Sequence, residues 1–529
     1  MSYASLIDPK NVSQRERLHD RQVLNNAGGY VFALDIWARL DRFLVLGSDA
    51  PTYYQSARKL TRENAKSVEA CWKADHRRTA EKIVEISKAG RAPKNSPAIF
   101  ALALGTLSDD VEARRAALSA VSSVCRTASH LFEFASLIDA LGRGWGRAVS
   151  RAISGWYENR SPEKLAYQMT KYRSRSGYTH ERAIQRAHPV AADGNAERIA
   201  LYRWACGGNL DGHVLPELVL GHLAAMKTEK ASELIPLIEK HELTWEQIPT
   251  WALTDAKVWE ALLPNLGMTA LLRNLGTLTD LGVLKPLGGR TSMVADWLTD
   301  AEEVRKSRLH PYSILNALAV YRSGRSVKGE RTWQAVSTVI DALDDAFYLA
   351  FGNVEATGKR HLLALDVSGS MSTNFIGGNV GVLSAREASA AMSMATARSE
   401  KQHHFVGFGQ SIHKLGISSK MSLAEVQMTI SGLPFARTDC AAPMLHALKV
   451  GLEVDVFVVY TDNETYFGSM HPSEALKLYR RETGIPAKLV VAGMTATGFS
   501  IADPDDGGMF DIVGFDSDAV SLMADFVRA

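Results

Sequence analysis

The apolar positions divide the chain into two regions with different periods. From about residue 63 to 350, apolar residues recur at helical spacing in stretches of roughly 12 to 20 residues, separated by short polar breaks. Examples are DVEARRAALSAVSSVCRT, ASELIPLIEKHE, MTALLRNLGTLTDLG and HPYSILNALAVYRSG. Such pairs recur at roughly 40 residues, the period of HEAT or armadillo repeats, in which no single pair can bury its apolar face alone. The pattern predicts an α-helical solenoid.

The beginning of this helical region is marked by a turn signal. Asn25-Asn26-Ala27-Gly28-Gly29 is followed by YVFALDIWARLDRFLVLGS, whose spacing indicates a short extended piece and then a helix. We expect the helical module to cover residues 1–358.

At residue 361 the period changes abruptly. HLLALDV, HHFVGFG, DVFVVYTD, AKLVVAGM and FDIVGF are short apolar runs that alternate with helical segments such as SAREASAAMSMATARSE and PSEALKLYRRE. Apolar strands alternating with helices predict a mainly parallel, Rossmann-like sheet that is covered on both faces. The boundary falls near Gly358-Lys359-Arg360, which gives a second domain over residues 359–529. In such sheets the ligand site lies at the carboxyl ends of the strands.

Oxygen-bearing side chains stand where these strands are predicted to end. Asp366, Ser368 and Ser370 follow the first strand, Thr438 precedes a helix, and Asp462 ends the run DVFVVYT. Three hydroxyls and two carboxylates suit Mg²⁺, which prefers near-octahedral oxygen at about 2.0–2.1 Å and keeps some water. We expect the three hydroxyls as direct ligands and the two carboxylates to act partly through water. One position would remain for an outside ligand oxygen.

This set resembles the metal-ion-dependent adhesion site of von Willebrand A domains, which has D-x-S-x-S, then a distant Thr, then an Asp. A lone D-x-S-x-S is most often a turn or a helix cap, so the prediction of a metal site depends on the presence of Thr438 and Asp462. One departure is Arg437, because small residues are common at that position. Its charge could restrict metal access or pair with an anionic ligand.

Charge is distributed unevenly along a chain whose formal net charge is only +2. Residues 361–529 hold 12 Lys+Arg against 18 Asp+Glu, a balance of −6, which leaves 48 against 40, or +8, for residues 1–360. Residues 141–190 alone hold 10 Lys+Arg and 3 Asp+Glu, an excess of +7. Such an excess suggests a polyanion partner, although a solvated helix face would explain charge alone equally well.

Within this basic stretch, KYRSRSGYTH (171–180) alternates cations with aromatic rings and hydroxyls. That mixture contacts phosphates, stacks on bases and bonds to 2′-hydroxyls. The alternative is that these residues have structural roles only. Tyr172 and Tyr178 would then pack between helices, Trp145 would be a core residue, and His188, which precedes a proline, would cap a helix.

Nearly the whole chain resembles the Ro autoantigen family, a TROVE module followed by a von Willebrand A-like domain. The matching segments, in the family's order, are RLDRFLVLGSDAPTYY, GWGRAV, KYRSRSGYTH, LLRNLG, HPYSILNAL, TGKRHLLALDVSGSM, TDCAAPM and YTDNET. The resemblance implies a closed ring of helical repeats that binds small Y-type RNAs on its outer rim and admits single-stranded 3′ ends of misfolded RNAs through its hole. The implied rim residues are Lys171, Arg175 and His188, with Arg173 and His180 as neighbours.

Several function classes are excluded or disfavoured. The four cysteines are far apart, which excludes a CxxC metal knuckle and predicts buried thiols. No apolar run is long enough to span a bilayer and the N-terminus lacks the apolar centre of a signal peptide, so we expect a cytoplasmic monomer.

Catalysis is disfavoured by the motifs. The chain has neither GxxxxGK[ST] nor GxSxG, and Ser368 stands where a haloacid-type phosphatase would need its second Asp. We therefore expect no enzyme, with an exoribonuclease as a partner by resemblance only. The alternative is a protein-interaction scaffold with a Mg²⁺-dependent ligand site, which leaves the basic segment unexplained.

Overall fold

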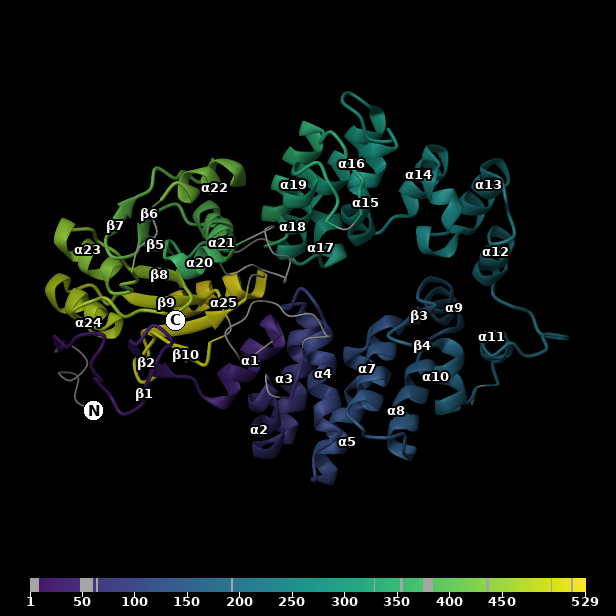
Figure 1. Ribbon diagram of the computed structural model, residues 1–529, viewed down its shortest axis with the longest axis horizontal. Helices are drawn as coiled ribbons and strands as arrows, with labels where there is room; N and C mark the ends of the chain where they lie inside the picture. The colour runs from purple at the N-terminus through teal and green to yellow at the C-terminus, as the bar shows by residue number, and fades with distance from the viewer. Residues whose placement is uncertain are drawn as a thin grey trace.

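The computed structural model describes residues 9–47, 60–62, 65–191, 194–327, 329–352, 355–373, 384–433, 437–495, 497–514 and 517–529. Within them, an arc of helices leaves a sheet domain and returns to it (Figure 1). The predicted combination of helical repeats and a parallel-sheet domain is confirmed. None of the helices in these ranges is long and apolar enough to cross a membrane. The end of the quoted segment RLDRFLVLGSDAPTYY lies outside the described residues.

The arc consists of paired helices joined by short turns. Several begin at a side chain that accepts a backbone N–H, as Asp75, Asp110 and Thr127 do, and Gly47 and Gly90 end two of them in the left-handed conformation. The α-helices are α1 (Ile36–Leu46), α2 (Lys66–Ala74), α3 (His76–Ala89), α4 (Ser96–Gly105), α5 (Val111–Ser119), α6 (Val121–Val124), α7 (Ala128–Ala140), α8 (Arg147–Glu158), α9 (Pro162–Lys171), α10 (His180–Ala187), α11 (Ala196–Ala205), α12 (Glu217–Ala225), α13 (Ala231–His241), α14 (Ala256–Leu262), α15 (Met268–Asp280), α16 (Gly289–Thr299), α17 (Ala301–Ser307), α18 (Pro311–Arg322) and α19 (Ser337–Leu349). Short 3₁₀ helices η4 (Trp245–Gln247), η5 (Thr250–Thr254) and η6 (Leu263–Asn265) and a hairpin of β3 (Ser174–Arg175) and β4 (Tyr178–Thr179) interrupt them.

The second domain is built around a six-stranded sheet of order β11-β9-β8-β5-β6-β7, parallel except for β7. Its strands are β5 (His361–Asp366), β6 (His403–Phe408), β7 (Ile412–Lys414), β8 (Val456–Thr461), β9 (Lys488–Gly493) and β11 (Met509–Val513). Its helices are α20 (Gly369–Thr373), α21 (Ala385–Ser399), α22 (Leu423–Ser431), α23 (Ala442–Val450), α24 (Pro472–Thr483) and α25 (Ser517–Arg528).

The core runs through both regions. All six residues of β5 and all six of β8 are buried, which explains why these strands appear in the sequence as continuous apolar runs. The core on one face of the sheet is continuous with the core of the helical arc, whereas the other face has a separate core. Of the four cysteines, three are buried as predicted and Cys206 is half-buried.

The N-terminal segment, which the sequence analysis assigned to the helical module, packs against the sheet domain. Strand β1 (Gln22–Leu24) pairs with β2 (Tyr30–Ala33), and β2 pairs with β10 (Phe499–Ser500). Ahead of these strands, the Gln14 amide donates to Asp439 Oδ1 at 2.7 Å and to the Met470 carbonyl at 2.8 Å. Residues 9–33 therefore lie against residues that follow them by more than 400 positions.

Both ends of the arc are tied to the sheet domain. At its start, the Arg42 guanidinium in α1 forms an ion pair with Asp511 of β11 at 2.7 Å, with only 1% of the arginine side chain exposed. Near its end, Asp344 of α19 accepts from the Leu423 backbone N–H at 3.1 Å. The arc also meets itself, because His310 Nε2 at the start of α18 lies 3.1 Å from the Arg91 carbonyl after α3.

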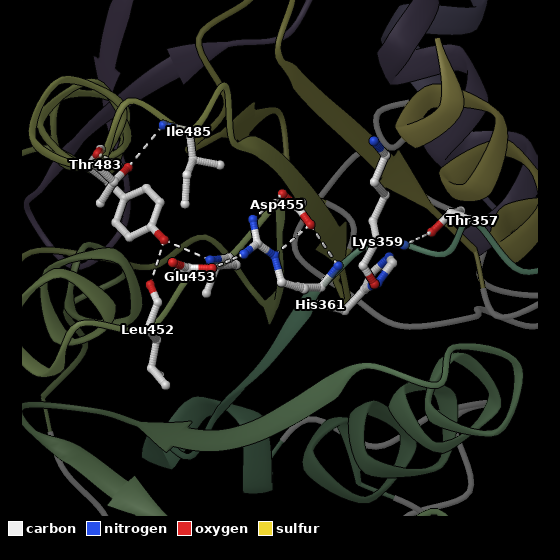
Figure 2. Close-up of polar contacts among 11 residues, drawn as sticks. Thr357, Lys359, His361, Leu452, Glu453, Asp455, Thr483 and Ile485 are labelled. Carbon is white, nitrogen blue, oxygen red and sulfur yellow. Dashed lines mark hydrogen bonds and ion pairs between the residues drawn. The ribbon is translucent and has the colours of Figure 1, made fainter.

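The passage from the arc into the sheet is fixed by ion pairs at the predicted boundary. Figure 2 shows Glu453 and Asp455 beside the start of β5 near His361. Asp455 accepts from Arg360 Nε at 2.9 Å and from its Nη2 at 2.8 Å, and the hydrogen bond from Arg360 lowers the pKa of Asp455. The boundary near Gly358 thus coincides with the beginning of β5.

The buried Arg42–Asp511 pair should contribute strongly to stability. We expect Asp511→Ala to lower the free energy of unfolding by about 3–5 kcal/mol, because it leaves a buried guanidinium without its carboxylate. Asp505→Ala, which removes the exposed partner of Arg21, should cost less than about 1 kcal/mol. Urea unfolding of the two variants measures the difference, and equal losses would contradict the assignment.

Candidate functional site

The predicted metal-binding residues meet at the carboxyl ends of β5 and β8. These strands are neighbours in parallel register, so Asp366 at the end of β5 lies beside Thr461 at the end of β8. The Thr461 hydroxyl donates to Asp366 Oδ2 at 2.6 Å, and the Ser368 backbone N–H donates to Oδ1 at 2.9 Å. Asp366 is therefore held rigidly beneath the loop that carries Ser368 and Ser370.

Four of the five predicted residues line one cavity of about 420 Å³, which we call the strand-end cavity: Ser368, Ser370, Thr438 and Asp462. The hydroxyl oxygens of Ser368 and Ser370 are 3.2 Å apart. Asp366 lies below them and is fully buried. The rule that ligand sites lie at the carboxyl ends of parallel strands, which we call the strand-end rule, thus predicted which side chains converge.

Two buried carboxylates so close together are electrostatically unfavourable. Burial, together with the nearby Asp462 carboxylate, raises the pKa of Asp366 to about 7. Burial also raises the pKa of Asp462, whose Oδ2 is buried without a hydrogen-bond partner among the described residues. One cation lies near, since the buried Arg386 guanidinium interacts with Asp366 and donates to the Val367 carbonyl.

The residues present fit a hard divalent cation. Two carboxylates, one with an unpartnered buried oxygen, and three hydroxyls form an all-oxygen donor set of the kind that Mg²⁺ selects. In the described ranges no cluster of three or more His, Cys, Asp or Glu side chains could hold a metal. An ion held by these residues would therefore depend on the serine and threonine hydroxyls as well as on the two carboxylates.

Sequence analysis did not identify two groups of residues that line the strand-end cavity. Asn26 and Ala27 of the N-terminal hairpin line it, and the Glu464 carboxylate accepts from the Ala27 N–H at 3.1 Å and from the Asn26 amide. Thr495 and Thr497 line it from the loop after β9. The strand-end rule would have found Thr495, whereas no local signal marks Asn26.

Arg437 does not cover the cavity. Its guanidinium is exposed and lies 5.3 Å from the centre of the Phe467 ring, and it is not among the residues that line the cavity. Of the two expectations for this residue, blockage of the cavity finds no support in this geometry, and pairing with an anionic ligand stays a prediction.

The predicted RNA-binding residues occupy different environments around the β3–β4 hairpin. Arg173, Arg175 and His188 are exposed. His188 ends α10 in the left-handed conformation with φ 51°, so it is the predicted helix cap and is still open to solvent. Lys171, in contrast, already has partners within the protein. Its amine lies 2.7 Å from the Tyr167 hydroxyl and 3.8 Å from Glu246, and only 11% of its side chain is exposed.

His180 was predicted to lie beside the RNA-contacting residues, but in the structure it is buried and has a structural role. It is buried, with Nδ1 3.0 Å from the Tyr157 hydroxyl and Nε2 3.3 Å from the Gln168 carbonyl, and the Phe132 ring meets it edge-on at 4.9 Å. Burial lowers the pKa of His180 to about 4. A basic segment suggested an exposed histidine, but helices α7, α8 and α9 enclose it.

Helical repeats joined to a von Willebrand A-like domain with a hydroxyl-rich site at its strand ends define the class of protein. Comparison with known families agrees, because the TROVE domain matches residues 23–206 and 237–320 and the Ro60 vWA domain matches residues 360–527. The chain belongs to the Ro60 family.

Its relatives cover nearly its full length. It is 41% identical over 526 residues to a protein of Deinococcus radiodurans named RNA-binding protein RO60, covering 99% of this chain and 98% of that protein. A Caenorhabditis elegans protein of the same name is 35% identical, over 97% of this chain and 91% of that protein. The crystal structure of the Deinococcus radiodurans RO (RSR) protein superposes with a TM-score of 0.71 at 39% identity, covering 93% of this chain and 99% of that chain.

The neutral state of His180 should appear in the pH dependence of stability. Because its pKa is lower in the folded chain than in the unfolded one, its contribution is present above about pH 6.5 and is lost as pH falls toward 4. Between pH 7 and 4.5, the unfolding free energy of His180→Asn should therefore decrease less steeply with falling pH than that of the wild type. The difference between the two slopes corresponds to at most about one proton taken up on unfolding. Urea midpoints across this range measure it, with the exposed His404→Asn as control; parallel curves for wild type and His180→Asn would refute the assignment.

Proposed function

We propose that this chain is a non-catalytic RNA-binding protein of a small ribonucleoprotein. The observation that carries the proposal is the β3–β4 hairpin with the preceding Arg173 (residues 173–179), which we call the basic hairpin. Its Arg173 and Arg175 are exposed and form no ion pair within the described residues. It lies in the segment with an excess of seven positive charges. The two relatives named RNA-binding protein RO60 support this interpretation over a solvated helix face.

The RNA class follows from the family resemblance. We propose small Y-type RNA on the face that carries Arg175 and His188, and single-stranded 3′ ends of misfolded RNA at a separate surface inside the arc. This arrangement would serve RNA quality control or processing together with an exoribonuclease. The contact between His310 and the Arg91 carbonyl supports a closed arc.

We also propose that the strand-end cavity holds Mg²⁺ or another divalent cation. Ser368, Ser370 and Thr438 would supply hydroxyl ligands, and Asp366 and Asp462 would act directly or through water. The ion's charge would offset the two buried carboxylates and leave a coordination position for an outside oxygen. The unpartnered Oδ2 of Asp462 supports this proposal.

The metal proposal predicts the effect of one hydroxyl. Ser370→Ala should abolish bound Mn²⁺, used as a probe for Mg²⁺, while RNA affinity stays within about twofold, because the two sites lie in different domains. Ser431→Ala, on the exposed face of α22, is the matched control. Anomalous density from crystals soaked in Mn²⁺ gives the readout, and equal density in both variants would refute the role of Ser370.

The RNA proposal predicts two surfaces and not one general basic patch. Arg175→Ser combined with His188→Asn should weaken binding of a structured small RNA at least tenfold, because charge-assisted contacts are typically worth about 1.5–3 kcal/mol each and about 1.4 kcal/mol is one decade. Asparagine is chosen because position 188 has a positive φ, which that residue tolerates. A single-stranded 3′ tail should lose little.

The control for this experiment removes two cations elsewhere. Arg305 and Lys306 of α17 are paired with Glu302 and Glu303, so Arg305→Ser with Lys306→Ser should leave both affinities nearly unchanged. Fluorescence anisotropy at fixed salt compares the RNAs. Equal losses for both RNAs would contradict the two-surface arrangement, and wild-type protein that binds neither would end the RNA proposal.

A further inference from the structure

We infer that Asp139 is a positioning residue for RNA binding, and that it holds Arg182 and Arg186 in place as phosphate contacts in addition to Arg175. The inference rests on the proposed function and deepens it, because it assigns two further cations and the acid that orients them. None of the three stands out in the sequence, where Asp139 is simply an acid ahead of a basic stretch.

Four donors converge on the Asp139 carboxylate. The Tyr178 hydroxyl donates to Oδ2 at 2.5 Å and the Trp145 indole N–H donates to Oδ1 at 3.1 Å. Arg186 Nη1 lies 2.9 Å from Oδ2, and Arg182 Nη2 lies 3.4 Å from it. One carboxylate thus joins the loop before α8, strand β4 and helix α10 to the end of α7.

The position of this acid is unfavourable on its own. Asp139 lies in the last turn of α7, where the helix dipole favours cations over anions. Partial burial works against ionisation too, but the hydrogen bonds from Tyr178 and Arg186 outweigh it and lower the pKa of Asp139. Its surroundings therefore keep it charged, which indicates that the carboxylate is there for its partners and not for the helix.

The two arginines lie over aromatic rings. Arg186 lies 4.0 Å from the centre of the Trp145 ring and Arg182 lies 4.3 Å from that of Tyr178, and the two rings are nearly parallel at 7°. Nevertheless 51% of the Arg182 side chain and 32% of the Arg186 side chain are exposed. Exposed arginines are normally mobile; these are fixed before any ligand arrives, which lowers the entropy cost of binding.

The cluster carries an unneutralised charge. Among the described residues two guanidinium groups share one carboxylate, so one positive charge remains there. Each guanidinium has five N–H donors, and the hydrogen bonds to Asp139, Tyr178 and the Gly177 carbonyl use only some of them. Fixed donors and excess positive charge favour a phosphate oxygen as the missing acceptor.

The cluster is continuous with the basic hairpin. Arg175 and Tyr178 are paired in register across β3 and β4, and Arg175 interacts electrostatically with His130 and Glu133 in the first half of α7. Tyr178 meets Asp139 in the last turn of the same helix. The hairpin therefore lies along α7 with Arg175 toward one end and the Asp139 cluster at the other.

Asp139→Asn gives opposite results for the two possible roles. If Asp139 were an ordinary surface acid, its removal from a basic face would strengthen RNA binding. A positioning role predicts at least threefold weaker binding of a labelled stem–loop RNA, despite the gain of one positive charge. The slope of log K against log salt should also become shallower by about 0.7 to 0.9 for each phosphate that the protein no longer neutralises.

The matched control is Glu181→Gln. Glu181 is an exposed acid in the first turn of α10 that accepts only from Gln185 among the described residues, so its neutralisation should leave binding unchanged or slightly stronger. Asp139→Glu tests whether a carboxylate alone suffices, and partial recovery of affinity is expected. Thermal melting of every variant separates loss of the cluster from loss of the fold.

A second pair of variants tests the roles of the two arginines directly, even if Asp139→Asn is unstable. Arg182→Gln and Arg186→Gln should each weaken the RNA complex and reduce the salt slope. Wild-type affinity in both glutamine variants, or tighter binding by a folded Asp139→Asn, would overturn the inference while leaving the proposed function intact. Absence of RNA binding by the wild type would instead remove the proposed function itself.

Discussion

The whole architecture depends on one constraint: both ends of the helical arc are attached to the same sheet domain. Strand β2 pairs with β10, and Arg42 of α1 pairs with Asp511 of β11, so the arc must start at the sheet. Because α19 contacts α22 and leads directly into β5, the arc must also end there. A helical array fixed at both ends has to curve back. The hydrogen bond between His310 and the Arg91 carbonyl, and the bond from Arg91 to the Val513 carbonyl, occur where the two ends of the arc meet beside the sheet.

This constraint also shapes the strand-end cavity. The N-terminal hairpin is brought against the loop after β8 so closely that a Cβ on Gly29 would lie 1.9 Å from the Thr465 carbonyl oxygen, which explains a glycine there. Asn25 donates to the same carbonyl at 2.7 Å, and Glu464 receives the Ala27 N–H. The candidate metal site is therefore assembled from the N-terminal hairpin and the strand-end loops of the C-terminal domain, and its shape depends on how the two pack.

The limits of sequence analysis follow from the same geometry. Periodicity predicted the helices and the sheet because amphipathic spacing is local, and the strand-end rule predicted Asp366, Ser370 and Asp462 because parallel strands carry their loops to one edge. The docking of residues 9–33 left no signal, since β2 is four residues long and its partner lies more than 460 positions away. His180 looked exposed for a related reason: Tyr157 and Phe132, which enclose it, come from other helices.

The two candidate sites are incomplete in opposite senses. At the strand ends, Asp366 and Asp462 are buried acids, and Arg386 is the cation that interacts with Asp366 among the described residues, so the site is short of positive charge. At the basic hairpin, Arg182 and Arg186 share Asp139 and Arg175 has no ion pair in the described part of the chain, so that site lacks negative charge. The two acids are buried, where charged groups are normally paired, whereas the arginines are partly or fully exposed and outnumber the acid beside them. A divalent cation would correct the first and a phosphate backbone the second, which makes ligand binding the simplest physical reason for both arrangements to persist in one chain.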